Sequence, residues 1–334
     1  MPQPTQNTAV SRPDLAVVVS EFRETAVTAA IGARVMPYLP MIEQSAEYPV
    51  IPKEVMLKIH ETRRAMRGKY PSSDWEFEMG FYATRENGWE EKIDDRERKL
   101  YATLLDAEMV ATRRATKIID LSTEKRIAAK VFNPSNFAPH NVSTPWDVPA
   151  SATPIDDFND ANLALRAQCG MPGNTLIIGF YTFTKVKNCD QIVDRLMYTF
   201  PGIDINSMTT QQLAAVLNVP RVLVGGAIYD SADKGQDAEI ADLWSSDYAM
   251  LTICSDSPDV SEPCIGRSMI WTEESPGSGE PVVESYRAEG NRSDVVRVRH
   301  DSDERLLKSY DEDGNVQSDI AAAVSYLMGN IKTT

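Results

Sequence analysis

Residues 74–81 alternate strictly between polar and apolar side chains, and this pattern constrains the fold more than any other stretch of the chain. A period of two is that of a β-strand, in which successive side chains point to opposite faces. One face of this predicted strand carries Trp75, Phe77, Met79 and Phe81. Because a two-stranded hairpin is only marginally stable in water, that apolar face must be covered by another part of the chain or by a neighbouring copy.

The predicted hairpin partner of this strand is the stretch at residues 54–60, which also alternates. Its apolar positions are Val55, Leu57 and Ile59. The polar tip between the two strands, residues 61–73, carries four basic side chains: Arg63, Arg64, Arg67 and Lys69. Glu61 is the single acid in the tip, which leaves a net charge of +3 in an acidic protein. We therefore predict an extended hairpin with an electrostatic docking surface at its tip.

The whole chain is acidic, with 49 Asp and Glu residues against 34 Lys and Arg residues. Such a surface repels phosphate, so sequence-specific binding of nucleic acid is disfavoured. The cysteines have no paired spacing, so we expect buried free thiols, in a reducing compartment, at Cys169, Cys189, Cys254 and Cys264. No apolar run approaches the roughly 18 residues of a membrane span, and residues 1–14 do not resemble a signal peptide. We expect a protein that is soluble and intracellular where it is made.

The residue types that usually carry catalysis are scattered along the chain. Three histidines have no carboxylate at metal-ligand spacing: His60, His140 and His300. Residues 275–279 lack the order of a nucleophile elbow, and the acids between residues 301 and 314 lack the spacing of a calcium loop. We therefore predict no catalytic, metal-binding or cofactor-binding residues. Paired carboxylates for acid–base catalysis meet in space and not in sequence order, so they would leave no local motif.

Residues 1–14 are polar and proline-rich and predict a flexible arm, whereas the apolar stretch at residues 15–41 must dock on another element. Residues 94–131 have helical periodicity and, as one helix, would span more than about 50 Å. We expect either a single rod or a break near Ser122.

Beyond a proline-rich connector, helices are expected at 153–170, 190–198 and 209–217, and strands at 175–180, 221–224, 249–254, 281–286 and 295–298. A tight turn at Asp313-Gly314 and a short apolar element at residues 321–328 complete the chain.

Several short motifs occur in a fixed order along these segments. They are Gly-Trp-Glu-Glu-Lys-Ile-Asp-Asp at 88–95, the helical stretch 121–131, Trp146, the helix at 153–170 with the strand at 174–179, the helix and strand at 212–225, and Ala-Asp-Leu-Trp at 241–244 before the apolar strand at 248–253. In this order they resemble the major capsid proteins of tailed bacteriophages that have the Hong Kong 97-type fold. The resemblance covers the chain from about Leu15 to the C-terminus.

The resemblance implies an α+β fold with an N-terminal arm, an extended hairpin loop, a long spine helix with a peripheral β-sheet, and a mixed α/β axial domain. The corresponding residues are 1–43 for the arm, 44–93 for the hairpin loop, 94–150 with about 265–310 for the spine and peripheral domain, and 151–264 with about 311–334 for the axial domain.

The resemblance also implies a structural protein that is not an enzyme and that assembles into pentamers and hexamers of an icosahedral shell around packaged double-stranded DNA. Each hairpin would lie over an adjacent copy, and the shell would bind no DNA sequence and no membrane. Expected partners are other copies of the chain, with a scaffold, portal and decoration proteins as further candidates. The expected location is the virion capsid, after assembly in the host bacterial cytoplasm.

Some features of the family are absent or open in this sequence. Only about forty residues precede the hairpin, so we expect a separate scaffold or none. Lys53, Lys58 and Lys69 lie in the hairpin region, but the sequence does not identify an isopeptide partner. Two other functions compete with the capsid interpretation: an encapsulin-like compartment, which shares the fold and encloses cargo enzymes, and an acidic α/β enzyme built on residues 153–254.

Overall fold

The computed structural model describes most of the chain. The described residues are 10–11, 30–64, 66–72, 77–101, 107–199, 208–233, 235–237, 239–255, 257, 262–273, 281–311 and 313–333. Trp75, the glycine-rich loop at 275–279 and nearly all of the predicted flexible arm lie outside them. No helix among the described residues is long and apolar enough to cross a membrane.

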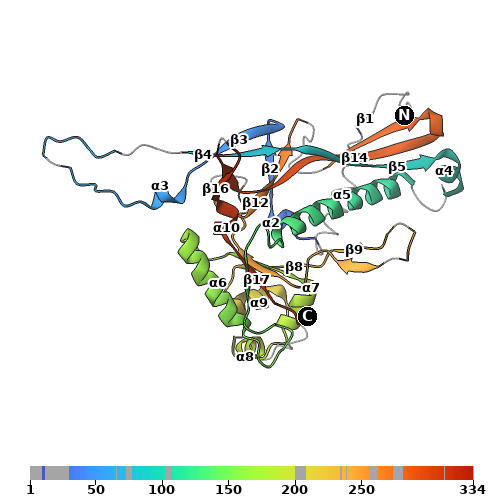
Figure 1. Cartoon of the computed structure of the whole chain (residues 1–334). Coiled ribbons are helices and arrows are strands. Elements are labelled where there is room, and N and C mark those ends of the chain that lie inside the picture. The colour runs from blue at the N-terminus through green and yellow to red at the C-terminus, as the bar shows by residue number, and fades with distance from the viewer. Residues whose placement is uncertain are drawn as a thin grey trace.

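The half of the molecule that we call the spine half is built on a long sheet, and one long helix runs along one face of it (Figure 1). The order of its strands is β1-β13-β14-β12-β2, and β5 pairs with β14 along their shared length. These strands are β1 (Val10–Ser11), β2 (Tyr38–Met41), β5 (Arg85–Asp94), β12 (Gly266–Trp271), β13 (Val282–Ala288) and β14 (Ser293–Leu306), with the 3-10 turn η2 (Glu289–Asn291) between the last two. The helix, α5 (Ala107–Val131), covers one sheet face through a core that includes Ile93, Ala115, Ile119, Val296 and Val298.

The predicted long helix forms, but it does not break at Ser122. A separate short helix, α4 (Asp95–Tyr101), precedes α5, and α5 then continues through Ser122 to Val131 over 25 residues, or about 37 Å. The buried hydroxyl of Thr123 donates to the carbonyl of Ile119 at 3.0 Å, so this polar side chain is satisfied inside the helix. The polar run Leu-Ser-Thr therefore does not stop the helix, because the Thr123 hydroxyl finds an acceptor one turn back and the Ser122 hydroxyl accepts from Arg126 one turn ahead.

The other half, which we call the α/β half, confirms the predicted alternation of helices and strands. Its sheet has the order β6-β17-β11-β7-β8. The strands are β6 (Pro139–Asn141), β7 (Thr175–Gly179), β8 (Arg221–Gly225), β11 (Ala249–Thr252) and β17 (Ser325–Gly329), and the helices around them are α6 (Pro154–Cys169), α7 (Phe180–Val186), α8 (Asp190–Thr199) and α9 (Thr210–Leu217). The left-handed Gly170, with φ of 81°, ends α6, and Thr209 forms a capping box with Gln212 at the start of α9.

A third sheet, with the order β16-β15-β4-β3, lies where the extended segment leaves the body. Its strands are β3 (Ser45–Val50), β4 (Glu78–Ala83), β15 (Lys308–Tyr310) and β16 (Val316–Asp319), followed by α10 (Ile320–Ala323). The predicted hairpin partner was wrong: β4 pairs with β3, and residues 53–57 form the helix α3 (Lys53–Leu57) after Pro52. The reason is a close fit, because Tyr48 lies opposite Gly80 and its ring occupies the space of the missing side chain.

The two halves and the N-terminal segment are joined at one buried carboxylate. Glu124 of α5 accepts hydrogen bonds from the backbone N–H groups of Ile31 and Gly32, at the start of α2 (Gly32–Val35), at 2.8 and 2.7 Å. It also accepts from the indole of Trp244, which precedes β11. The apolar stretch that was predicted to dock on another element therefore does so in its described part, residues 30–41, which packs on the spine helix and on β12.

Candidate inter-subunit surface

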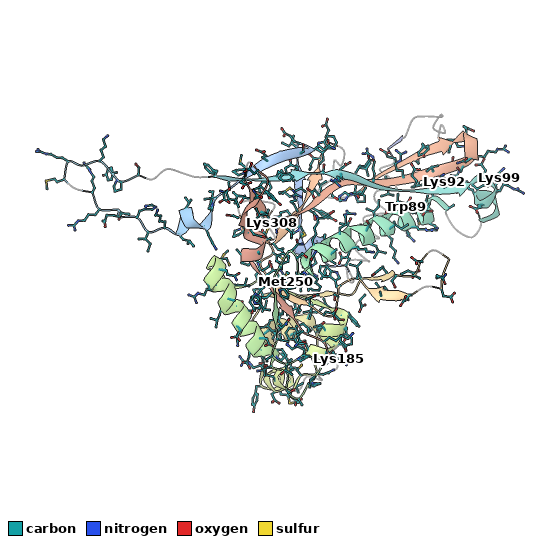
Figure 2. All side chains as sticks on the ribbon, viewed as in Figure 1. Trp89, Lys92, Lys99, Lys185, Met250 and Lys308 are labelled. Carbon is teal, nitrogen blue, oxygen red and sulfur yellow. The ribbon has the colours of Figure 1, made fainter. Side chains whose placement is uncertain are left out.

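Residues 51–64 and 66–72, the described part of what we call the extended segment (51–72), project from the body between β3 and β4 (Figure 1). Apart from α3, its described residues have no helix or strand structure. Large apolar side chains stand in solvent along it; Ile59 and Met66 are each 97% exposed, and Leu57 and Tyr70 are also exposed. Figure 2 shows the side chains of this segment standing clear of the rest of the molecule. A segment with so much exposed apolar surface has the properties of a contact site for another molecule.

The four predicted basic residues lie together near the end of the extended segment and are exposed. The guanidinium group of Arg64 lies 4.7 Å from the centre of the Tyr70 ring, and its Nε donates to the carbonyl of Gly68 at 2.6 Å. Arg67 has a positive φ of 64°, which turns the chain at this point. The local turn therefore gathers Arg63, Arg64, Arg67 and Lys69 at one end of the segment, far from the acidic body.

The predicted apolar face of β4 is the exposed face of its sheet. Phe77, Met79 and Phe81 are 44–55% exposed, whereas Gly80 and Tyr82, on the opposite face, are buried. The sequence pattern identified which residues share a face but not that the glycine and tyrosine side would face the core. Trp75, the fourth predicted residue of this face, lies outside the described residues.

The register of the sheet extends this face across neighbouring strands. Met79 is paired with Pro49 on one side and with Tyr310 on the other, and Tyr310 is paired with Val316. Paired residues share a face, so these four side chains form an apolar row across the sheet. Sequence reasoning missed Pro49, Tyr310 and Val316, because the signal lies in non-local register and not in any local motif.

Charged and aromatic groups hold this exposed face in a defined shape. The ring of Phe81 lies 5.2 Å from that of Tyr310, and the guanidinium group of Arg305 lies 4.3 Å over Phe81. Beneath the sheet, burial raises the pKa of Tyr48 to about 12, so its phenol stays neutral and donates to the carbonyl of Lys308 at 3.4 Å. The face is thus a platform built on paired strands and held by ring contacts, and not part of a loop.

In the part of the chain that the structure describes, the histidines and acids do not form a cluster that could hold a metal ion. His140 stacks on Tyr326 with ring centres 4.2 Å apart, and buried His300 meets Tyr38 edge-on at 5.8 Å. Within the described ranges, no three His, Cys, Asp or Glu side chains are placed to hold a metal ion. The four cysteines are free thiols; Cys189, Cys254 and Cys264 are buried as predicted, but the prediction of burial was wrong for Cys169, which is partly exposed near the end of α6.

Comparison with known proteins gives one informative match by sequence. The chain is 27% identical over 278 residues to the major capsid protein of Burkholderia phage BcepMu. The aligned region covers 80% of this chain and 84% of that protein. No family model matches the chain.

Comparison of structures identifies the fold. A phage-related protein from Bordetella bronchiseptica is similar with a TM-score of 0.67 at 21% identity, over 97% of this chain and 99% of that one. The capsid of Helicobacter pylori bacteriophage KHP30 is similar with a TM-score of 0.54 at 12% identity, over 87% of both chains. The chain therefore has the α+β Hong Kong 97-type capsid fold, as its sequence predicted.

Proposed function

We propose that this chain, which has a phage capsid fold and a phage major capsid protein as its sequence relative, is itself a major capsid protein that self-assembles into an icosahedral shell. The match to the BcepMu protein carries the proposal, because it covers four fifths of this chain and not a single motif. The geometry of the candidate surface supports a structural role, since its exposed side chains form an apolar face on β4 and a basic extended segment.

Assembly by repeated contacts between identical copies explains the exposed apolar surface. The extended segment and the β4 platform would each be covered by a neighbouring copy, with Phe77, Met79 and Phe81 and the four basic residues in the contact. When a contact joins different surfaces of identical subunits, repeating it closes a ring if the rotation between neighbouring subunits divides a full turn. Rings of five and six copies are the pentamers and hexamers from which an icosahedral shell is built.

The charge of the chain is compatible with a container for DNA. A net charge of −15 gives little counterion release on contact with phosphate, so the shell would enclose double-stranded DNA without binding a particular sequence. A scaffold, portal and decoration proteins are further proposed partners. The proposed location is the virion capsid, after assembly in the host bacterial cytoplasm, and the proposed role includes no enzymatic step.

We assign the domains as the resemblance implies: residues 1–43 to the arm, 44–93 to the hairpin loop, 94–150 with about 265–310 to the spine and peripheral domain, and 151–264 with about 311–334 to the axial domain. Two pairings support this division. β12 and β14 complete the sheet beneath α5, and β17 completes the sheet of the α/β half. The end of the hairpin-loop range, β5, is integrated into the spine sheet through its pairing with β14.

The test is the state of the purified full-length chain, measured by light scattering and viewed by negative-stain electron microscopy. Closed shells of uniform diameter are expected, and particles recovered from a phage lysate should contain DNA. Particles filled with a cargo protein instead would favour an encapsulin-like compartment. A stable monomer or dimer at every protein and salt concentration would favour the acidic α/β enzyme and overturn the capsid proposal.

A further inference from the structure

Residues 228–242 form a two-stranded arm that leaves the α/β half beside α5 (Figure 1). The strand β9 (Ile228–Asp230) pairs with β10 (Ile240–Asp242), and among the described residues these two strands pair with nothing else. A two-stranded ribbon is marginally stable in water on its own. Its faces must therefore be supported from outside the ribbon.

The two faces of the arm differ in what covers them. Tyr229 and Ala241, which are paired with each other, are partly buried, and the Lys125 ammonium of α5 lies 4.7 Å from the centre of the Tyr229 ring. The other face carries Ile228 and Ile240, which are 52% and 70% exposed. Each isoleucine is paired across the ribbon with an aspartate, Asp242 and Asp230 respectively. The chain thus supports one face of its arm and leaves an apolar, acidic face in solvent.

The arm and the extended segment have opposite charges. Residues 228–242 contain five acids against one lysine, a net charge of −4, whereas residues 61–73 have a net charge of +3. Both surfaces also expose aliphatic side chains, Ile240 in the arm and Ile59 and Met66 in the segment. The two surfaces are therefore complementary in charge and similar in apolar character.

These complementary surfaces project from opposite sides of one molecule, as Figure 1 shows. The arm and the segment of a single chain are therefore not in contact, and a second copy must supply the matching surface. Such a contact joins different patches of identical chains, so it propagates in one direction around a ring.

We propose that the outer face of the arm docks on the extended segment of a neighbouring copy, at its four basic residues and at Ile59 and Met66. This inference rests on the proposed capsid function and names one contact within it. The acids Asp233, Asp237 and Glu239 meet the basic side chains, and Ile228 and Ile240 cover the aliphatic side chains of the segment. The contact orders the segment and supports the ribbon in the same step.

A charge-swap experiment on the full-length chain tests the contact. The arm variant is Asp237→Lys with Glu239→Lys, and the segment variant is Arg63→Glu with Lys69→Glu; all four side chains are exposed. Each variant alone places like charges together, and the yield of closed shells should fall about tenfold or more. A chain that carries both pairs of substitutions should recover most of the wild-type yield. Asp313→Lys, an exposed acid in a turn outside both surfaces, is the matched control and should assemble normally.

A cross-linking experiment locates the contact independently of yield. In a Cys169→Ser background, which removes the one cysteine that is not buried, Asp237→Cys and Arg67→Cys are introduced together. Oxidation of assembled shells should give covalent ladders of the chain, and oxidation of unassembled subunits should not. Circular dichroism and thermal unfolding check that each variant is folded.

The outcomes separate this contact from the capsid proposal. If each charge variant closes shells at the same yield as the wild type, the arm contact is wrong and the capsid function stands. The same conclusion follows if assembled shells with the paired cysteines give no covalent ladder. If both variants fail and their combination fails as well, the arm does not pair with the segment. If wild-type chains form no shells under any condition, the capsid proposal and this inference fall together.

Discussion

The indole Nε1 of Trp244 donates a 2.7 Å hydrogen bond to the buried carboxylate of Glu124. The two residues are 120 positions apart, and their bond ties the α/β half to the spine helix. The same carboxylate accepts the N–H groups of Ile31 and Gly32, and a Cβ at position 32 would lie 2.4 Å from one of its oxygens. One acid therefore sets the relative position of three parts of the fold.

Glu124→Gln is expected to destabilise the subunit. Three donors converge on the two carboxyl oxygens, which can both accept whether or not the group is protonated, whereas an amide offers one oxygen and turns its NH2 group, which accepts nothing, toward a donor. The unfolding free energy should fall by about 1–3 kcal/mol, measured by urea titration. Glu97→Gln, at an exposed position of α4, is the control and should unfold like the wild type. An unchanged midpoint for the Glu124 variant would show that the carboxylate does not join the three parts.

The destabilisation by Glu124→Gln should depend on pH in one direction. Burial raises the pKa of Glu124 above its ordinary value of 4.5, against the lowering effect of its three hydrogen bonds. The folded state therefore binds this proton more tightly than the unfolded state, so the contribution of Glu124 to stability falls as pH rises from 4.5 through the raised pKa. The difference in unfolding free energy between wild type and variant should be largest below pH 4.5 and should shrink above it. A gap that widens with rising pH would contradict this sign.

Phe77→Ser with Met79→Ser should separate folding from assembly. Both side chains are about half exposed on the outer face of the platform, so the unfolding free energy should change by less than about 0.5 kcal/mol. The yield of closed shells should fall about tenfold or more, because buried apolar anchors dominate contacts between subunits. Val148→Ser removes a similarly exposed apolar side chain elsewhere and is the matched control. Normal shells from the double variant would show that the platform faces solvent in the particle.

Gly80→Ala should destabilise the sheet at the base of the extended segment. A Cβ at this position would lie 2.3 Å from the Tyr48 ring, which is buried and has no room to withdraw. Overpacking of this kind costs about 1–3 kcal/mol, and thermal unfolding would report the loss. Gly290→Ala, where a Cβ meets nothing within 4 Å, is the control. Adding Tyr48→Leu to Gly80→Ala should recover part of the stability if the ring is the obstacle.

Local signals predicted the elements of the α/β half well. The capping box at Thr209 and the glycine at 170 act within one helical turn, so their effect can be read directly from the sequence. The strand prediction at 54–60 failed because β3, and not this stretch, pairs with β4. The Tyr48 ring of β3 fits against Gly80 of β4, a contact that the three alternating apolar residues at 54–60 do not signal. Helix α7 and the arm at residues 228–242 were not anticipated, because neither has a clear periodic pattern.

The sequence by itself determined that Phe77, Met79 and Phe81 share one face and that a basic cluster follows Glu61, since side-chain period and charge are properties of the local chain. Only the tertiary structure decided that this face points outward. Tyr48, Met269 and Leu307 fill the space beneath Gly80 and Tyr82, so the more apolar side of β4 has no room in the core of its own chain. Burial depends on what packs against each side of a strand, and those partners lie more than 30 residues away in either direction.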